Sequence, residues 1–226
     1  MAAAKAISGC WTAYAALTRG VDLRPGDTVL VSAAGGAIGS MAGQLARLLG
    51  AGRVIGSTGS ADKARALVAE LGYDAAVVRG AQEPLERQLA RAAPGGIDVF
   101  LDNTGGEQLR CAVTVAREGA RFVLVGALSG QLAARGAGRT CPVELDSFQL
   151  LLKKITMRGY SADEDFATGH PEWLRRFGGW LRSGEIVFPQ VRVTGLEHAV
   201  TALLEVIRGR HLGTVIVELP REPELP

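Results

Sequence analysis

The sequence of 226 residues lacks a charge excess, a cysteine framework and long apolar runs. Its formal net charge is +2, from 25 basic and 23 acidic residues, so we expect no nucleic-acid-binding face. The three cysteines, Cys10, Cys111 and Cys141, are widely spaced and odd in number, and the three histidines share no ligand spacing. We therefore expect no disulfide, no metal site and a cytoplasmic location. No apolar run approaches the roughly 20 residues that cross a bilayer, so we expect no membrane span.

Lysine is also scarce, because only four of the 25 basic residues are lysine. We interpret this bias as the codon usage of a GC-rich bacterial genome. The apolar residues 6–17 after Lys5 have some likeness to a leader peptide, but Ser8, Thr12 and Tyr14 interrupt them. We expect this segment to form a helix that opens the domain.

Short apolar runs alternate with helix-like segments along the first 125 residues. The pattern predicts strands at 27–33, 53–57, 75–78, 97–101 and 121–125, and helices at 40–49, 61–71, 85–92 and 107–117. The strands are apolar on both faces, as strands of a covered parallel sheet are. The fold class predicted is α/β, a doubly wound, mostly parallel Rossmann sheet with helices on both faces.

The rhythm changes after residue 126. We expect a loop at 130–139, a sixth strand at Ile155–Tyr160, two short strands at 191–193 and 214–219, and helices at 148–153, 171–182 and 196–208. Trp173, Phe177 and Trp180 share one face of the second of these helices, which predicts core or interface. We expect a single domain over 1–219 and a frayed tail at 220–226.

Residues 32–40 join the first predicted strand to the first predicted helix and contain three glycines. Ala34, Gly36 and Gly39 have the spacing of a dinucleotide-binding loop, with alanine in the first place. The loop predicts that an anion such as a pyrophosphate binds at Gly36, Ala37, Ile38 and Gly39, where the helix begins. The alternative is a tight turn without a ligand.

The end of the second predicted strand carries no carboxylate. NAD-binding domains place Asp or Glu there to accept the ribose hydroxyls. Here the strand runs into Ser57 and Thr58, the first acid is Asp62, and Lys63 and Arg79 lie nearby in sequence. Hydroxyls and cations suit a 2′-phosphate, so we predict NADP(H) as the cofactor, bound in part by Ser57, Lys63 and Arg79. The alternative is that both cations are solvated surface charges.

Several short motifs occur together in a fixed order along nearly the whole chain. They are Thr12-Ala13-Tyr14, Pro25-Gly26-Asp27-Thr28-Val29, Gly36 to Ser40, Gly59-Ser60-x-x-Lys63, Asp102-Asn103-x-Gly105-Gly106 and Gly126-x-x-Ser129. The combination resembles the zinc-independent medium-chain dehydrogenase/reductases. It is most similar to the branch of NADPH-dependent double-bond reductases that act on prostaglandins, leukotrienes and curcumin. The resemblance implies a Rossmann-type NADP(H)-binding domain over residues 1–219.

The resemblance also implies site residues beyond the phosphate loop and Lys63. The implied cofactor contacts are Asn103, Gly126, Ala127, Leu128, Ser129, Gln131, Tyr160 and His211. Tyr160 and Ser129 are, in addition, the hydroxyl groups that we expect to be catalytic.

The chain departs from the resembled family at several positions. Relatives begin with a barrel-like domain for which there is no counterpart after Met1. Gln131 and Arg79 stand where the branch has tyrosines, and His211 stands where it has asparagine. We therefore expect the lone chain to be a slow reductase. If its cleft is re-lined by Tyr14, Gln131 and Tyr160, we expect a bulky or polycyclic substrate.

Two functions remain open. The first is an NADPH-dependent oxidoreductase that reduces an activated C=C bond or a quinone, truncated to its cofactor domain. The second is a non-redox biosynthetic enzyme of cyclase type, or a partner-binding subunit, that keeps the fold. Under either, we expect a small-molecule substrate and a homodimer paired through Ile155–Tyr160. A separate chain that supplies the missing domain is a further expected partner.

Overall fold

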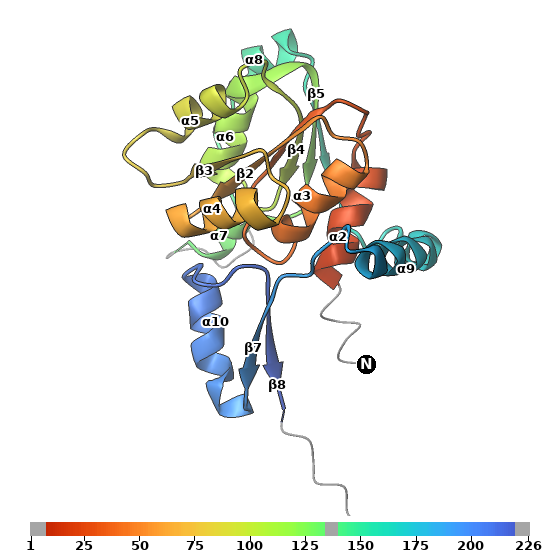
Figure 1. Cartoon of the computed structure of the whole chain (residues 1–226). Coiled ribbons are helices and arrows are strands. Elements are labelled where there is room, and N and C mark those ends of the chain that lie inside the picture. Colours follow the sequence, from red (N-terminus) through yellow and green to blue (C-terminus); the bar gives the residue numbers. More distant parts are fainter. Residues whose placement is uncertain (1–7, 134–139, 220–226) are drawn as a thin grey trace, which may run out of the picture.

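Six parallel strands form the main sheet of the protein (Figure 1). The computed structural model describes residues 8–133 and 140–219, so part of the predicted loop at 130–139 and the predicted tail lie outside the described residues. The strand order is β3-β2-β1-β4-β5-β6, and every neighbouring pair is parallel. The strands are β1 (Thr28–Val31), β2 (Arg53–Thr58), β3 (Ala75–Val78), β4 (Ile97–Asp102), β5 (Ala116–Leu124) and β6 (Thr156–Gly159). The predicted doubly wound sheet is confirmed.

Helices cover both faces of this sheet because successive strand residues point to opposite sides. In β1, Val29 and Val31 enter one buried core and Leu30 enters the other. The first core packs against α2 (Ser8–Ala15), α3 (Gly39–Leu48) and α4 (Ala61–Glu70), and the second against α5 (Leu85–Ala92) and α6 (Gly106–Val115). The short helices α7 (Leu128–Gln131) and α8 (Ser147–Leu152) follow β5.

The first described helix opens the domain, as expected, and continues into a π-helix at Ala16–Gly20. It packs beside α9 (Phe166–Ser183), where Trp173 and Phe177 are buried and stacked. The prediction of a core role for these two aromatic residues is confirmed.

Tyr14 was expected to line a cleft, but that is wrong: it is only 2% exposed and its hydroxyl donates to Glu172 at 3.2 Å. Cys10 is buried in the same helix, and burial raises the pKa of its thiol to about 12.

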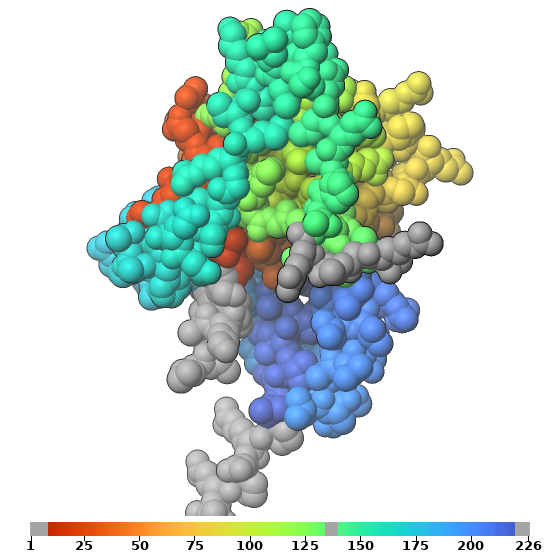
Figure 2. Space-filling model, turned by 180° about the vertical axis from the view of Figure 1, so that it is seen from behind, coloured from red at the N-terminus to blue at the C-terminus, as the bar shows by residue number. Residues whose placement is uncertain are grey.

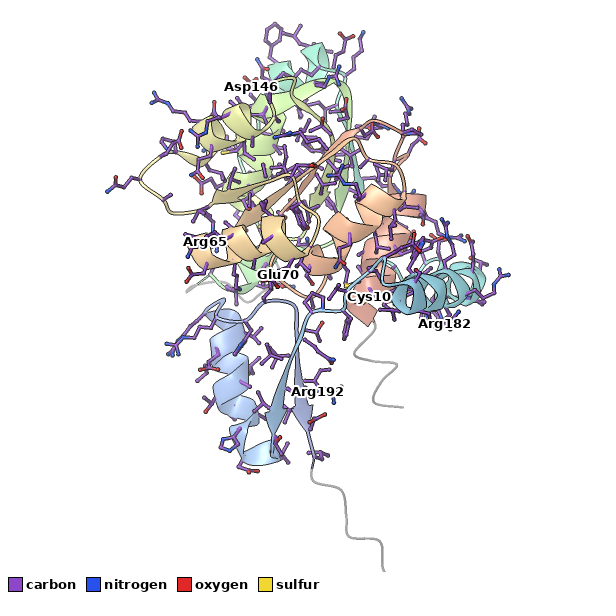
Figure 3. All side chains as sticks on the ribbon, in the orientation of Figure 1. Cys10, Arg65, Glu70, Asp146, Arg182 and Arg192 are labelled. Carbon is purple, nitrogen blue, oxygen red and sulfur yellow. The ribbon has the colours of Figure 1, made fainter. Side chains whose placement is uncertain are left out.

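The last two strands do not join the main sheet. β7 (Gln190–Thr194) and β8 (Thr214–Glu218) pair with each other, and α10 (Ala199–Ile207) connects them after a short 3₁₀-helix at Leu196–His198. Arg192 of β7 forms an ion pair with Glu218 of β8 (Figure 3). We call β7, α10 and β8 the C-terminal lobe, which lies beyond the carboxyl ends of the main strands in Figure 1. In Figure 2 it is the blue part below the main body.

One backbone hydrogen bond ties the C-terminal lobe to the main body. The N–H of Gly213 donates to the carbonyl of Gly35, in the loop after β1, at 2.9 Å. Gly213 has a φ of +79°, and a Cβ on it would stand 2.2 Å from the carbonyl oxygen of Pro189. Only glycine fits there, so the position of the lobe depends on that residue.

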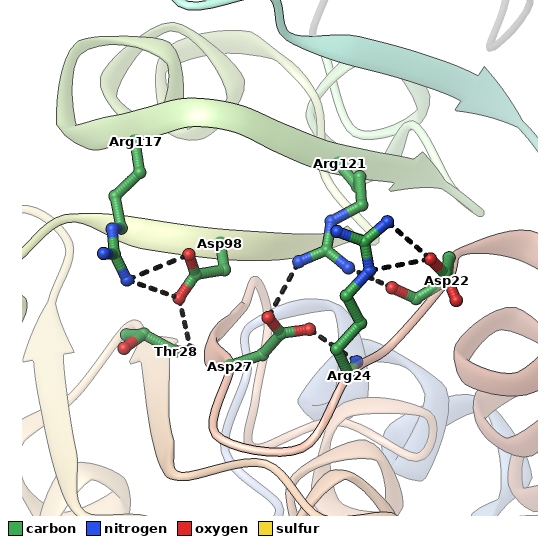
Figure 4. A network of polar contacts seen from close by, with 7 residues as sticks. All are labelled: Asp22, Arg24, Asp27, Thr28, Asp98, Arg117 and Arg121. Carbon is green, nitrogen blue, oxygen red and sulfur yellow. Dashed lines mark hydrogen bonds and ion pairs between the residues drawn. The ribbon is translucent and has the colours of Figure 1, made fainter.

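A network of arginines and aspartates holds the opposite, amino-terminal ends of the strands (Figure 4). Asp27 accepts hydrogen bonds from the N–H of Arg24 at 2.7 Å and from the guanidinium of Arg121 at 2.8 Å. Asp98 accepts the N–H of Thr28 at 2.9 Å. The side chains of Arg121 and Asp27 are only 13% and 9% exposed, so this pair is largely shielded from water.

We predict that Asp27→Ala destabilises the fold by about 3–5 kcal/mol, because it leaves the Arg121 guanidinium buried without its carboxylate. Urea unfolding followed by circular dichroism measures the change. The matched control is Asp62→Ala, which removes an ion pair whose side chains are 74% and 87% exposed and should barely shift the midpoint. Equal midpoints for the two variants would contradict the prediction.

Candidate functional site

The carboxyl ends of β1 and β4 are joined by the carboxylate of Asp102. This side chain is fully buried and accepts the Ser32 hydroxyl at 2.7 Å. It also accepts the backbone N–H of Thr104 at 2.8 Å and that of Gly105 at 3.0 Å. Because a buried carboxylate is tolerated only when it is well hydrogen-bonded, these contacts fix the loop that follows β4.

Asn103 lies next to this carboxylate and was expected to contact a cofactor. Its backbone N–H donates to the Ser32 hydroxyl at 2.7 Å, and its side-chain amide donates to the Ser32 carbonyl at 2.7 Å. The remaining oxygen, Oδ1, is buried and has no hydrogen-bond partner among the described residues. The arrangement therefore leaves one acceptor unused, and such a group is costly to bury unless a donor reaches it.

The predicted phosphate loop lies between β1 and α3, as the sequence indicates. A Cβ on Gly39 would stand 2.4 Å from the carbonyl oxygen of Ala33, so glycine is needed for the helix to start this close to the loop. A Cβ on Gly36 would meet that oxygen at 3.3 Å. Gly36 and Ala37 line a cavity, whereas Ile38 and Gly39 are not among its lining residues.

This cavity, of about 1010 Å³, lies between the carboxyl ends of the strands and the C-terminal lobe. Its basic lining groups are Lys63, Arg79, Arg208 and His211, and no aspartate or glutamate lines it within the described part of the chain. The lobe contributes an aliphatic wall that includes Leu203, Val206 and Ile207. Sequence reasoning missed this wall, since nothing in the pattern of α10 places it opposite the phosphate loop.

Lys63, in the first turn of α4, and Arg79, directly after β3, both line the cavity, where the sequence predicts a phosphate contact. The Lys63 stem passes the phosphate loop, with Cδ 3.0 Å from where a Cβ on Gly35 would stand. Burial lowers the pKa of the Lys63 ammonium. The N–H of Arg79 donates to the Thr58 carbonyl at 2.8 Å, which holds its backbone beside β2. Neither cation has an ion pair in residues 8–133 and 140–219.

Ser57 reaches the same cavity, but its hydroxyl is already engaged. It is 3% exposed and donates to Oε1 of Gln108, a residue in the first turn of α6. Gln108 also lines the cavity, and sequence reasoning did not identify it. No sequence signal could have linked the two, because they are 51 residues apart.

The two expected catalytic hydroxyls are not brought together. Ser129 lines the cavity, but its hydroxyl donates to the Thr104 carbonyl at 2.5 Å and lies 3.1 Å from the Cys141 sulfur. Tyr160 is buried outside the cavity lining and donates to Asp165 at 2.6 Å. Burial, with the hydrogen bond to Asp165, raises the pKa of Tyr160, which makes it a weaker acid. Both catalytic roles remain predictions.

Of the other expected cofactor contacts, some line the cavity and some do not. Leu128 and His211 line the cavity, and the His211 imidazole is 2.9 Å from a Glu205 carboxylate oxygen. Gly126, Ala127 and Gln131 do not line it. Within the described ranges, no three His, Cys, Asp or Glu side chains are grouped as a metal ion would need. No helix in those ranges is long and apolar enough to cross a membrane.

A family model described as zinc-binding dehydrogenase matches residues 37–172 of the chain. A 2-alkenal reductase (NADP(+)-dependent) from Nicotiana tabacum is 32% identical over 93% of this chain. An NADPH-dependent curcumin reductase from Escherichia coli is 29% identical over 92% of it. The chain spans 60% of the length of each of these two relatives.

Solved structures agree with the sequence comparisons. CurA from Vibrio vulnificus, crystallised in complex with NADPH, superposes with a TM-score of 0.83 at 32% identity. That match covers 94% of this chain and 62% of CurA. The fold therefore extends over most of this chain.

Proposed function

Because the chain belongs to the zinc-binding dehydrogenase family, we propose that it binds NADP(H) as the cofactor-binding part of an oxidoreductase. The reaction that we propose is the reduction of an activated C=C bond or a quinone. In support, two relatives are named as a 2-alkenal reductase and a curcumin reductase. The observation that carries the proposal is the cavity beside the phosphate loop, lined by basic groups and by no acid among the described residues.

The free groups of the cavity match the charges of NADP(H). Lys63 and Arg79 would hold the 2′-phosphate, at the place where NAD-binding domains have a carboxylate. The amides at Ala37 to Gly39 would hold the pyrophosphate at the start of α3, whereas the N–H of Gly36 already donates to the Ala33 carbonyl at 2.9 Å. Asn103 is not among the residues that line the cavity, and its Oδ1 is buried, so its contact with the nicotinamide half stays a prediction.

Zinc has no place in this proposal, although the family description names it. The described residues hold no group of His, Cys, Asp or Glu side chains that could bind a metal ion, so we derive no step through one. The expected zinc-independent branch is consistent with the relatives, which are named for NADP-dependent reduction.

The cofactor, when bound, supplies a hydride, and this chain's residues bind and orient it. The proton that completes a reduction needs a separate donor. Ser129 and Tyr160 were the expected sources, but the first hydroxyl is held by a carbonyl and the second by Asp165. This observation keeps a second candidate open, in which the fold serves a non-redox biosynthetic reaction of cyclase type or a partner protein.

We infer a bacterial, cytoplasmic protein with a role in biosynthesis. We also infer that its substrate is a small molecule, bulky or polycyclic in shape. We also infer a partner chain that completes the site. In support, the lobe leaves large aliphatic side chains such as Leu196, Val200 and Leu203 more than half exposed. Mass photometry or pull-down with the neighbouring gene products tests whether a partner chain binds. If the chain alone turns over substrate at an ordinary rate, the inferred partner chain is contradicted.

We predict a two-fold homodimer in which β6 pairs with β6 of a second copy. β6 is the last strand of the sheet, so its outer backbone groups have no strand partner among the described residues. Light scattering at micromolar concentration should give about twice the 23.7 kDa mass of one chain. A monomer mass under these conditions would rule the pairing out.

We predict that NADPH binds more tightly than NADH and that Lys63→Ala removes most of the difference. A charge-assisted contact to phosphate contributes about 1.5–3 kcal/mol, so the variant should lose roughly ten- to hundredfold in affinity for NADPH only. Titration calorimetry with both cofactors measures this. Lys154→Ala is the matched control, because the Lys154 ammonium pairs with the exposed Glu118 and does not line the cavity. This variant should bind both cofactors like the wild type. Equal affinities of the wild type for NADPH and NADH would contradict the assignment of NADP(H) as the cofactor.

We predict slow NADPH oxidation, followed at 340 nm, with small enones and quinones. The rate should lie below the enzyme median of about 10 s⁻¹, because neither expected proton donor is free in the cavity. Turnover at or above that median would show that a donor has been overlooked. A chain that binds NADPH but oxidises it with no member of the panel would favour the non-redox candidate instead.

A further inference from the structure

Ser57 and Gln108 are two polar side chains next to an apolar core. Ser57 follows Ile55 on the same face of β2, and Ile55 and the neighbouring Val77 belong to the core under α5 and α6. Gln108 precedes Leu109, which belongs to the same core. Ser57 is 3% and Gln108 6% exposed. Aliphatic residues would fill this space at lower cost, so the polar pair calls for a reason beyond packing.

The pair satisfies only one half of the Gln108 amide. Its Oε1 accepts the Ser57 hydroxyl, and no acceptor for the Nε2 donors occurs among the described residues. Both residues line the cavity beside Lys63 and Arg79. Nε2 is not among the side-chain atoms that are closed off from solvent, so it can donate to a ligand acceptor in the cavity.

Most other polar groups of the cavity wall are already engaged. The Thr104 hydroxyl donates to Asp102, the Ser129 hydroxyl donates to the Thr104 carbonyl, and the Ser60 hydroxyl accepts from the backbone of Lys63. Among the described lining residues, the groups left for a ligand include the cations and the Gln108 amide. All of these are donors, so the ligand beside them must offer acceptors in addition to its negative charge.

We propose that Gln108 donates a hydrogen bond from Nε2 to the adenosine half of the cofactor and that Ser57 is the residue that positions it. This rests on the proposed function, since the end of β2 is where the adenosine half of a dinucleotide lies in such a sheet. Gln108 then contributes affinity for the nucleoside, whereas Lys63 selects the 2′-phosphate. Ser57 touches no ligand with its hydroxyl and acts by holding Gln108 in one orientation.

The test compares binding of NADPH, NADH and adenosine 2′,5′-bisphosphate by titration calorimetry. Gln108→Leu should weaken all three ligands by the same factor, about three- to tenfold, as expected for one neutral hydrogen bond. Lys63→Ala should instead weaken only the two ligands that carry the 2′-phosphate. The exposed Gln82 provides the matched control, and Gln82→Leu should bind all three like the wild type.

Ser57 is tested through its coupling to Gln108. Ser57→Ala should lose about as much affinity as Gln108→Leu, and the double variant should lose no more than Gln108→Leu alone. Ser57→Thr keeps the hydroxyl and should restore binding. Thermal melting of each variant shows whether it is folded before its affinity is compared.

The outcomes separate this inference from the proposed function. Wild-type affinity in folded Gln108→Leu would overturn the inference, as would a loss confined to the ligands with a 2′-phosphate. Additive losses in the double variant would overturn the role of Ser57. If the wild type bound none of the three ligands, the proposed function itself would be wrong, and the inference with it.

Discussion

The buried carboxylate of Asp102 is the constraint on which the rest of the site depends. It draws the Ser32 hydroxyl and the N–H groups of Thr104 and Gly105 to one point between β1 and β4. Asn103 is held by the same serine, and the Thr104 carbonyl in turn accepts the Ser129 hydroxyl. All of these groups meet at one buried side chain, which ties the loop after β1 to the loop after β4.

The cavity that these loops face is biased toward negative ligands. Lys63 approaches it from the first turn of α4, Arg79 from the end of β3 and Arg208 from the C-terminal lobe. No acid occurs among the described lining residues. Burial lowers the pKa of the Lys63 ammonium, and a bound anion would offset that penalty. The bond from Gly213 to Gly35 places the lobe as the second wall, so the residues that line the cavity come from distant parts of the chain.

The sequence was enough for the parts of this structure that depend on local pattern. The order of strands and helices follows from apolar periodicity, and the phosphate loop follows from Gly36 and Gly39 between a strand and a helix. The separate pairing of β7 with β8 was not foreseen, since a strand's partner is not encoded in its own pattern. The orientation of Tyr160 could not be predicted either, because it is set by the hydrogen bond to Asp165 and by burial beneath neighbouring elements.

A crystal structure of the chain grown with NADP⁺ tests the central claim most directly. We expect the pyrophosphate against the amide of Ala37 at the start of α3 and the 2′-phosphate within hydrogen-bonding distance of Lys63. We also expect Asp102 to keep its present donors when the cofactor is bound. A cofactor bound elsewhere, or a 2′-phosphate that points into solvent away from Lys63 and Arg79, would contradict the claim.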